Sequence, residues 1–247
     1  MPFKGTADAF GRLLWDTHNG ASVAEIIERD DGNIGVGSAD CRAYFSAFKD
    51  WSAEERAAIR FARGLVLDVG CGAGRAALYL QEQGLKVVAI DASPLAVRVC
   101  RSRGVKKALV LPFESVGKLA PLRFDTILMF GNNFGLFGNP AKARRLMKVL
   151  SKLSSEHAVI IATTRDTDLS EHKEYHRANR KRGRMAGQLT LRVRYKNLIG
   201  PWFDYLFVSP SELKRLLVGT GWSIRKMFKS KRKPEYAVVL EKSTPDR

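Results

Sequence analysis

Short apolar segments alternate with amphipathic segments along most of this chain, and this alternation limits the folds that it can adopt. Apolar runs separated by helical patterns of about ten residues are typical of βαβ units, in which the strands pair in parallel and helices cover both faces of the sheet. The sequence therefore predicts an α/β fold. The expected strands cover residues 64–69, 86–91, 108–111, 124–130 and 157–163, and the expected helices cover 73–83, a segment opening at Ser93 and Pro94, and 140–152.

The pattern changes beyond residue 164. Residues 165–187 are polar and weakly periodic, which is typical of a long loop or an exposed helix, whereas 188–195 and 202–208 are expected to form an antiparallel hairpin. The stretch "SPSELKRLLVGTGW" carries a serine cap, a proline, an apolar stripe and a final glycine, so it predicts a helix. Two last strands, 223–228 and 235–241, would complete the sheet.

Length and composition suit one core domain with additions, because 247 residues at 45% hydrophobic content can bury a single large core. We expect an N-terminal cap of short helices at 1–60, with apolar residues at Leu13, Leu14, Val23, Ile26 and Ile27. A core domain at 61–247 would follow, with an insertion at about 165–208 that forms a lid or hairpin.

The stretch "VLDVGCGAGR" at 66–75 passes from the first core strand into a glycine-rich turn, where backbone N–H groups face the ligand edge of such sheets. A dinucleotide fingerprint would need a third glycine at Arg75, so an NAD-dependent dehydrogenase is disfavoured. Asp68 would repel a pyrophosphate and suits a ligand with a positive group. Asp91 lies 23 residues later, where an acidic residue bonds ribose hydroxyls. Together the two acids indicate a cation-bearing adenosyl ligand.

Three motifs in their order, "VLDVGCGAGR", "VVAIDASP" and "FDTILMFGNNFGLFG", resemble the class I S-adenosylmethionine-dependent methyltransferases, in particular the small-molecule branch with methyltransferase-domain 11/25-like sequences. The resemblance covers about residues 60–165, and the C-terminal helix and strands fit the end of the family's fold. It implies a Rossmann-like, seven-stranded, mostly parallel sheet, with S-adenosylmethionine as cofactor and S-adenosylhomocysteine as product. A catalytically idle partner subunit finds no support, because both acids and the glycines are intact.

The resemblance also implies roles for single residues. The glycine turn would lie under the methionine part of the cofactor, Asp91 would hold the ribose, and the loop after residue 111 would contact the adenine. The residues after the fourth strand would border the methyl group and the substrate. The implied cofactor-binding residues are Asp68, Gly70, Cys71, Gly72, Gly74, Asp91, Ala92, Ser93, Phe113, Glu114, Gly131 and Asn132.

The absence of one motif restricts the class of molecule that can accept the methyl group. Family members that methylate exocyclic amines carry an N/D-P-P-Y/F tetrad after the fourth strand, but this chain has "GNNFG" there. We therefore expect methyl transfer to a hydroxyl or amine of a small molecule by in-line displacement. No general base is evident, and the candidates for a catalytic role are His18, Asn132 and Asn133. The candidates for substrate binding are Tyr44, Asn133, Arg192, Arg194, Tyr195 and Trp202.

The formal net charge of +17 keeps an alternative open. The insertion "HKEYHRANRKRGR" interleaves Arg and Lys with Tyr175, which could track a phosphate backbone and stack a base, as in an RNA methyltransferase. Against this alternative, the basic residues are spread along the chain, no appended RNA-binding domain is recognisable, and substrate lids commonly occupy this position.

The three cysteines are too few and too scattered for a disulfide framework or a zinc site, so no metal is expected. The chain has no apolar run long enough to cross a membrane and no signal-peptide pattern at its N-terminus. We therefore expect a cytoplasmic protein that acts as a monomer or homodimer on a small molecule, without a membrane partner.

Overall fold

The computed structural model describes residues 8–230 and 233–243. The chain divides into two compact units, each built from three segments. Unit 1 comprises Met1–Trp51, Leu67–Ser115 and Thr190–Phe203, and unit 2 comprises Ser52–Val66, Val116–Leu189 and Asp204–Arg247.

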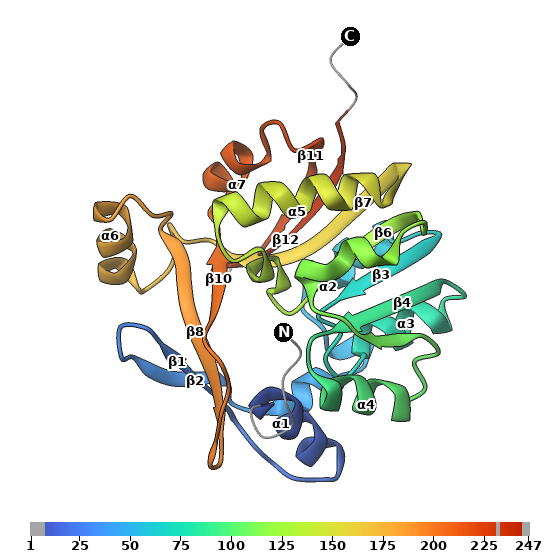
Figure 1. The fold of residues 1–247 in the computed structure, drawn as a ribbon, viewed down its shortest axis with the longest axis horizontal. Helices are drawn as coiled ribbons and strands as arrows, with labels where there is room; N and C mark the ends of the chain where they lie inside the picture. Colours follow the sequence, from blue (N-terminus) through green and yellow to red (C-terminus); the bar gives the residue numbers. More distant parts are fainter. Residues whose placement is uncertain (1–7, 231–232, 244–247) are drawn as a thin grey trace. The chain divides into compact units, whose positions relative to one another are not determined.

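Unit 1 combines the first half of the α/β alternation with the N-terminal segment and most of a long strand from the insertion (Figure 1). Its elements are α1 (Ala9–His18), β1 (Glu25–Arg29), β2 (Ile34–Ser38), η2 (Cys41–Phe45), η3 (Phe48–Asp50), the end of β3 (Leu65–Val69), α3 (Arg75–Glu82), β4 (Lys86–Asp91), α4 (Pro94–Ser102), β5 (Ala108–Val110), most of β8 (Gly187–Tyr195) and β9 (Leu198–Ile199).

Unit 2 contains the second half of the alternation and the C-terminal strands. Its elements are α2 (Ala53–Ala58), η4 (Ile59–Phe61), most of η5 (Phe113–Leu119), β6 (Phe124–Met129), η6 (Asn133–Phe137), α5 (Pro140–Lys152), β7 (Ser154–Arg165), α6 (Lys173–Lys181), β10 (Phe203–Phe207), α7 (Pro210–Leu217), β11 (Trp222–Lys229) and β12 (Glu235–Lys242).

The main sheet has seven strands in the order β11-β12-β7-β6-β3-β4-β5, which confirms the expected Rossmann-like class. Within unit 1, β4 pairs in parallel with β5, and within unit 2, β6 pairs in parallel with β7. The C-terminal strands run the other way, because β12 is antiparallel to both β7 and β11. Val87–Asp91 of β4 and Ala158–Thr164 of β7 are buried throughout, as expected for strands covered on both faces.

The second sheet is antiparallel, in the order β10-β8-β1-β2 with β9 paired to β8. It contains the hairpin predicted from the insertion, but it also corrects the prediction of short helices around Val23, Ile26 and Ile27. Ile27 lies in β1, which pairs with β2 on one side and with β8 on the other. The helical prediction holds for Leu13 and Leu14, which lie in α1, but it was wrong for Ile26 and Ile27. The second partner of β1, strand β8, lies more than 150 residues away in the sequence and leaves no local signal.

The helices begin where the sequence places caps. In unit 1, Ser93 caps α4 by accepting a hydrogen bond from the Ala96 N–H at 2.9 Å, and Pro94 occupies the first turn. In unit 2, Ser209 and Glu212 form a capping box at the start of α7. The predicted helix bounds of 140–152 match α5, which packs against β7 (Figure 1).

Candidate active site

The glycine turn after β3 is a left-handed backbone fixed to the neighbouring strand. Gly70, Gly72 and Gly74 have φ angles of 68°, 52° and 80°, a region that side chains other than glycine rarely adopt. The N–H groups of Gly70 and Cys71 donate to the Ile90 carbonyl at 2.8 and 3.0 Å. A Cβ at Gly74 would lie 2.7 Å from the Cys100 Sγ, so this position has no space for a side chain either.

Asp91 holds the turn through both of its carboxylate oxygens. Oδ2 accepts from the Gly72 N–H and Oδ1 from the Ser93 N–H, each at 2.9 Å. Burial, with a smaller contribution from the Asp8 carboxylate, raises the pKa of Asp91 to about 6, and the backbone N–H donors of Ser93, Gly72 and Ala92 oppose that rise. Each carboxylate oxygen has a second lone pair, so Asp91 can still accept hydrogen bonds from a ligand.

Asp68, at the end of β3, is a buried carboxylate that the described residues satisfy only in part. Its side chain is 3% exposed, and Oδ2 accepts no hydrogen bond from any described residue. Burial raises the pKa of Asp68 to about 7; the positive charge of Arg75 lowers it and the nearby Asp91 raises it further. A buried oxygen of this kind has a free energy cost that a cationic or N–H-bearing ligand would relieve.

The start of α1 packs beside this turn and joins it to α4. Asp8 accepts from the Gly11 N–H at 2.9 Å with Oδ1, and from the Ser93 hydroxyl at 2.7 Å and the Leu95 N–H at 3.3 Å with Oδ2. One carboxylate therefore caps the N-termini of two helices. Sequence reasoning missed Asp8, although an aspartate directly before an apolar, periodic segment is a helix-start signal that could have found it.

The adenine-side residues predicted from the resemblance follow β5. Asp91 pairs with Val110, and the Leu111 N–H donates to the Asp91 carbonyl at 2.8 Å. This register brings the chain that leads to Phe113 and Glu114 next to the end of β4. Unit 1 thus brings together ten of the predicted cofactor residues, namely Asp68, Gly70, Cys71, Gly72, Gly74, Asp91, Ala92, Ser93, Phe113 and Glu114.

Gly131, Asn132 and Asn133 lie in unit 2, at the turn between β6 and η6. Asn132 is left-handed, with φ of 64°; its N–H donates to the Thr163 hydroxyl at 2.8 Å, and its carbonyl accepts from the Tyr205 hydroxyl at 2.6 Å. Its side-chain amide makes no hydrogen bond to the described residues. The backbone of this turn is therefore fixed, while one polar side chain is available to a ligand.

The predicted substrate arginines are engaged with an acid. Arg192 forms a bidentate pair with Glu28, at 2.7 and 3.0 Å, and Arg194 bonds to the same carboxylate. These bonds lower the pKa of Glu28 to about 2. Alternation along β8 places both arginines on the face opposite Val193, which packs in the core cluster with Leu13 and Leu14 of α1.

The remaining substrate candidates also have partners in unit 1. Tyr44 donates its hydroxyl to Glu25 at 2.9 Å, and Tyr195 donates to Asp16 at 2.9 Å. Trp202 is 43% exposed and lies under the Arg192 guanidinium, 4.3 Å from the ring centroid. These three aromatic residues are held by the antiparallel sheet and by α1, and their role in substrate binding stays a prediction.

His18 is not brought to the glycine turn. It ends α1, where its ring stacks on Phe45 and its Nε2 lies 3.1 Å from the Ser102 hydroxyl. Ser102 ends α4, about 13 Å along the helix from Ser93. The role of His18 as a catalytic base stays a prediction.

Comparison with known proteins agrees with the geometry of the turn. A model of the methyltransferase domain matches residues 66–155. The chain is also similar to an S-adenosylmethionine-dependent methyltransferase from Bacteroides fragilis, solved with S-adenosyl-L-homocysteine, at 26% identity and a TM-score of 0.83 over 99% of this chain and 98% of that one. The matched domain is that of an S-adenosylmethionine-dependent methyltransferase.

Two further solved structures share the fold of this methyltransferase at lower identity. Magnesium protoporphyrin IX methyltransferase from Synechocystis PCC 6803 is 12% identical, with a TM-score of 0.57 over 96% of this chain and 95% of that one. The CcbJ methyltransferase from Streptomyces caelestis is 14% identical, with a TM-score of 0.59 over 80% and 95%.

Residues 8–230 and 233–243 contain no cluster of three or more His, Cys, Asp or Glu side chains suited to a metal ion. Every helix within these same ranges is too short or too polar to span a bilayer.

Proposed function

We propose that the glycine turn of unit 1 binds S-adenosylmethionine and that this methyltransferase transfers its methyl group to a hydroxyl or amine of a small molecule. The observation that carries the cofactor assignment is the Asp68 Oδ2 atom, which is buried and without a hydrogen-bond donor beside a turn of left-handed glycines. An α-ammonium group would supply both the missing donor and the missing positive charge.

The neighbouring residues fit the rest of the cofactor. Asp91 offers unused lone pairs for the ribose hydroxyls, and the bare Gly70–Gly72 backbone allows close approach of the methionine part. Ala92, Ser93, Phe113 and Glu114 would border the adenine. Gly131 and Asn132 keep the role that the resemblance implies for them, next to the methyl group.

The bound cofactor supplies a methyl group made electrophilic by its sulfonium. The protein then has to bind the cofactor and the acceptor, orient them and exclude water from the site. These effects alone can supply a large part of the acceleration of methyl transfer. For Asp68 the task is electrostatic. Its raised pKa means that part of the population is protonated near neutral pH, and binding of an ammonium requires the proton to leave.

A small-molecule acceptor is supported by the turn after β6. The paired prolines of exocyclic-amine methyltransferases are absent, and the Asn132 carbonyl is already bonded to the Tyr205 hydroxyl and the Gly135 N–H. That carbonyl is therefore less available to hold a planar amino group. The free Asn132 amide and the nearby Asn133 are better suited to orient a hydroxyl or an amine.

The proposal is tested by methyl transfer from labelled S-adenosylmethionine to a panel of small hydroxyl and amine acceptors, with total RNA as a separate acceptor. We expect label in small molecules, and a loss of at least about tenfold in the Asp68→Asn variant. Asp125→Asn is the control. Asp125 is an acid of unit 2 whose carboxylate accepts a hydrogen bond from the Leu65 N–H, and it is not one of the predicted cofactor residues. Label found only in RNA would overturn the substrate assignment in favour of the RNA alternative.

A further inference from the structure

A second candidate site lies within unit 2, under helix α6. A cavity of about 250 Å³ opens there between α6 and the chain that follows β7. It is lined by Thr167, Asp168, Lys173, His176, Arg177 and Arg180. Three of these six residues are permanently cationic and one is acidic, so the cavity has an excess of positive charge.

Helical spacing concentrates the cations on one side of α6. Residues 173, 177 and 180 follow an i, i+4, i+7 pattern, which places their side chains on one face of the helix. Lys173 and Arg177 have no ion-pair partner among the described residues. Arg180 lies 3.5 Å from Asp168, but both side chains are 56% exposed, and a surface pair of this kind contributes little.

Buried hydrogen bonds hold helix α6, which carries these cations, against the neighbouring chain. Asn179 is 1% exposed, and its Nδ2 donates to the Ala186 and Gln188 carbonyls at 2.9 and 2.8 Å. His176 is also buried and bonds to the backbone of Thr167; its pKa is lowered by burial, so the ring is neutral near pH 7. The Thr167 hydroxyl is occupied as well, since it donates to Glu212 at 2.9 Å. The helix is therefore anchored, and the cationic side chains of Lys173 and Arg177 offer donors at the cavity that no described residue engages in an ion pair.

We propose that this cavity binds a single phosphate group, either as free phosphate or as a phosphomonoester. Two unpaired cations and the loosely paired Arg180 match the charge of a dianion, and the planar guanidinium groups of Arg177 and Arg180 suit its oxygens. The volume is below the usual range of about 300–1,000 Å³ for small-molecule pockets, and it suits one compact group. This inference is independent of the cofactor assignment, because no residue of the glycine turn takes part.

The competing explanation is that α6 follows an RNA backbone. In that case Lys181 and Arg182, which lie on the same basic segment and outside the cavity, would contribute as much as the lining residues. A single-phosphate site needs only the lining residues. The two explanations therefore differ in which arginines and lysines matter.

The test is a ³¹P NMR titration of the full-length protein with inorganic phosphate and, separately, with glycerol 3-phosphate at constant ionic strength. We expect saturable binding that weakens by about tenfold in Lys173→Gln and in Arg177→Gln. The matched control is Lys181→Gln, which removes the same charge from the same helix and should bind as the native protein does. Asp168→Asn should bind more tightly because it removes the competing carboxylate, and a damaged fold could not produce that gain.

Comparison of the two titrations distinguishes free phosphate from an organic phosphomonoester as the ligand. Tighter binding of glycerol 3-phosphate would identify an organic monoester, whereas equal binding would identify the phosphate group alone; either result supports the site. The absence of saturable binding would overturn it, as would an effect of Lys181→Gln equal to that of Arg177→Gln. A short RNA that binds far more tightly than both phosphates, with a steep dependence on salt, would also overturn it in favour of the RNA backbone.

Discussion

At the scale of single residues, the burial of Asp68 makes the stability of the methyltransferase depend on pH. The pKa of Asp68 rises from 3.8 to about 7 on folding, so between these values the folded state holds a proton that the unfolded state has lost. Stability from this group is therefore greatest at low pH and falls as pH rises toward 7. One pKa unit corresponds to about 1.4 kcal/mol, so the effect on the unfolding free energy is on the order of a few kcal/mol.

Asp68→Asn should remove most of this dependence, because the amide carries no titrating proton. Denaturant unfolding of the ligand-free protein between pH 5 and pH 8 measures the difference between the two proteins. We expect the native free energy of unfolding to fall more steeply with pH than that of the variant, so the variant gains relative stability at pH 8. Parallel pH profiles would contradict the burial of an unpaired carboxylate at this position.

The sequence identified Asp68 and Asp91 as acids, but not how strongly their environment perturbs them. Spacing relative to the glycines is a local property, and it placed both at the ends of their strands. The raised pKa values come first from burial; in addition, the nearby Asp91 carboxylate raises the pKa of Asp68 and the Asp8 carboxylate raises that of Asp91, and all of these effects depend on the tertiary fold. Only the structure shows that Asp68 Oδ2 lacks a donor.

At the scale of elements, Asp8 couples the N-termini of α1 and α4. Asp8→Ala would remove the acceptor of the Gly11 N–H, the Ser93 hydroxyl and the Leu95 N–H together. Loss of one helix cap costs about 1 kcal/mol, so we expect about 2 kcal/mol or more at this double cap. Urea unfolding measures the loss. Asp40→Ala is the control, because Asp40 caps only the exposed η2 segment, and an equal loss in both variants would contradict the coupling.

The conformation of the turn after β6 depends on the lack of a side chain at Gly135. A Cβ on Gly135 would lie 2.0 Å from the Tyr205 Cε1, and Tyr205 is the residue that bonds to the Asn132 carbonyl. Gly135→Ala should therefore displace Tyr205, destabilise the protein by about 1–3 kcal/mol and reduce methyl transfer. Gly117→Ala is the control, since its Cβ would meet only ordinary contact with Val149 at 3.8 Å. Native-like stability and activity in Gly135→Ala would show that the turn does not rely on this packing.

Elements whose signals are local were predicted well, and those that depend on distant partners were not. The bounds of α5 and β4 match their predicted ranges because caps and apolar runs define them locally. β1 was assigned to a helix, because its strand conformation rests on pairing with β8 at positions such as Ile27 and Val193. Likewise, the caps on α1 and α4 are local features, but their sharing of Asp8 is a tertiary contact.

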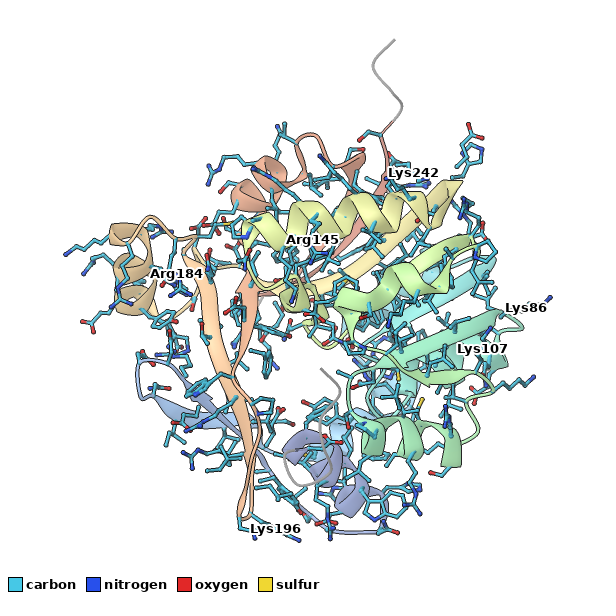
Figure 2. The ribbon with its side chains drawn as sticks, in the orientation of Figure 1. Lys86, Lys107, Arg145, Arg184, Lys196 and Lys242 are labelled. Carbon is cyan, nitrogen blue, oxygen red and sulfur yellow. The ribbon has the colours of Figure 1, made fainter. Side chains whose placement is uncertain are left out.

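At the scale of the whole molecule, basic residues occur in both units, but unit 2 carries +14 of the formal net charge of +17 (27 Lys and Arg against 13 Asp and Glu), whereas unit 1 carries +3 (15 against 12). Figure 2 labels Lys86, Lys107 and Lys196 on separate segments of unit 1, and Arg145, Arg184 and Lys242 on separate segments of unit 2. Basic side chains that are spread over several segments attract any polyanion without reading its sequence. We expect RNA binding without sequence selectivity that loses at least about tenfold in affinity between 50 and 200 mM salt, as measured by fluorescence anisotropy. Selective binding that persists at the higher salt would favour a nucleic-acid substrate.

The central claim is that the acids at the ends of β3 and β4 bind the cofactor, and calorimetric titration with S-adenosylmethionine tests it most directly. The account predicts saturable binding to the native protein, and a loss of about tenfold to a hundredfold in Asp91→Asn, since one of its oxygens no longer accepts from ribose hydroxyls. Asp125→Asn should bind as the native protein does. No binding to the native protein, or equal binding to a folded Asp91→Asn variant, would contradict the account.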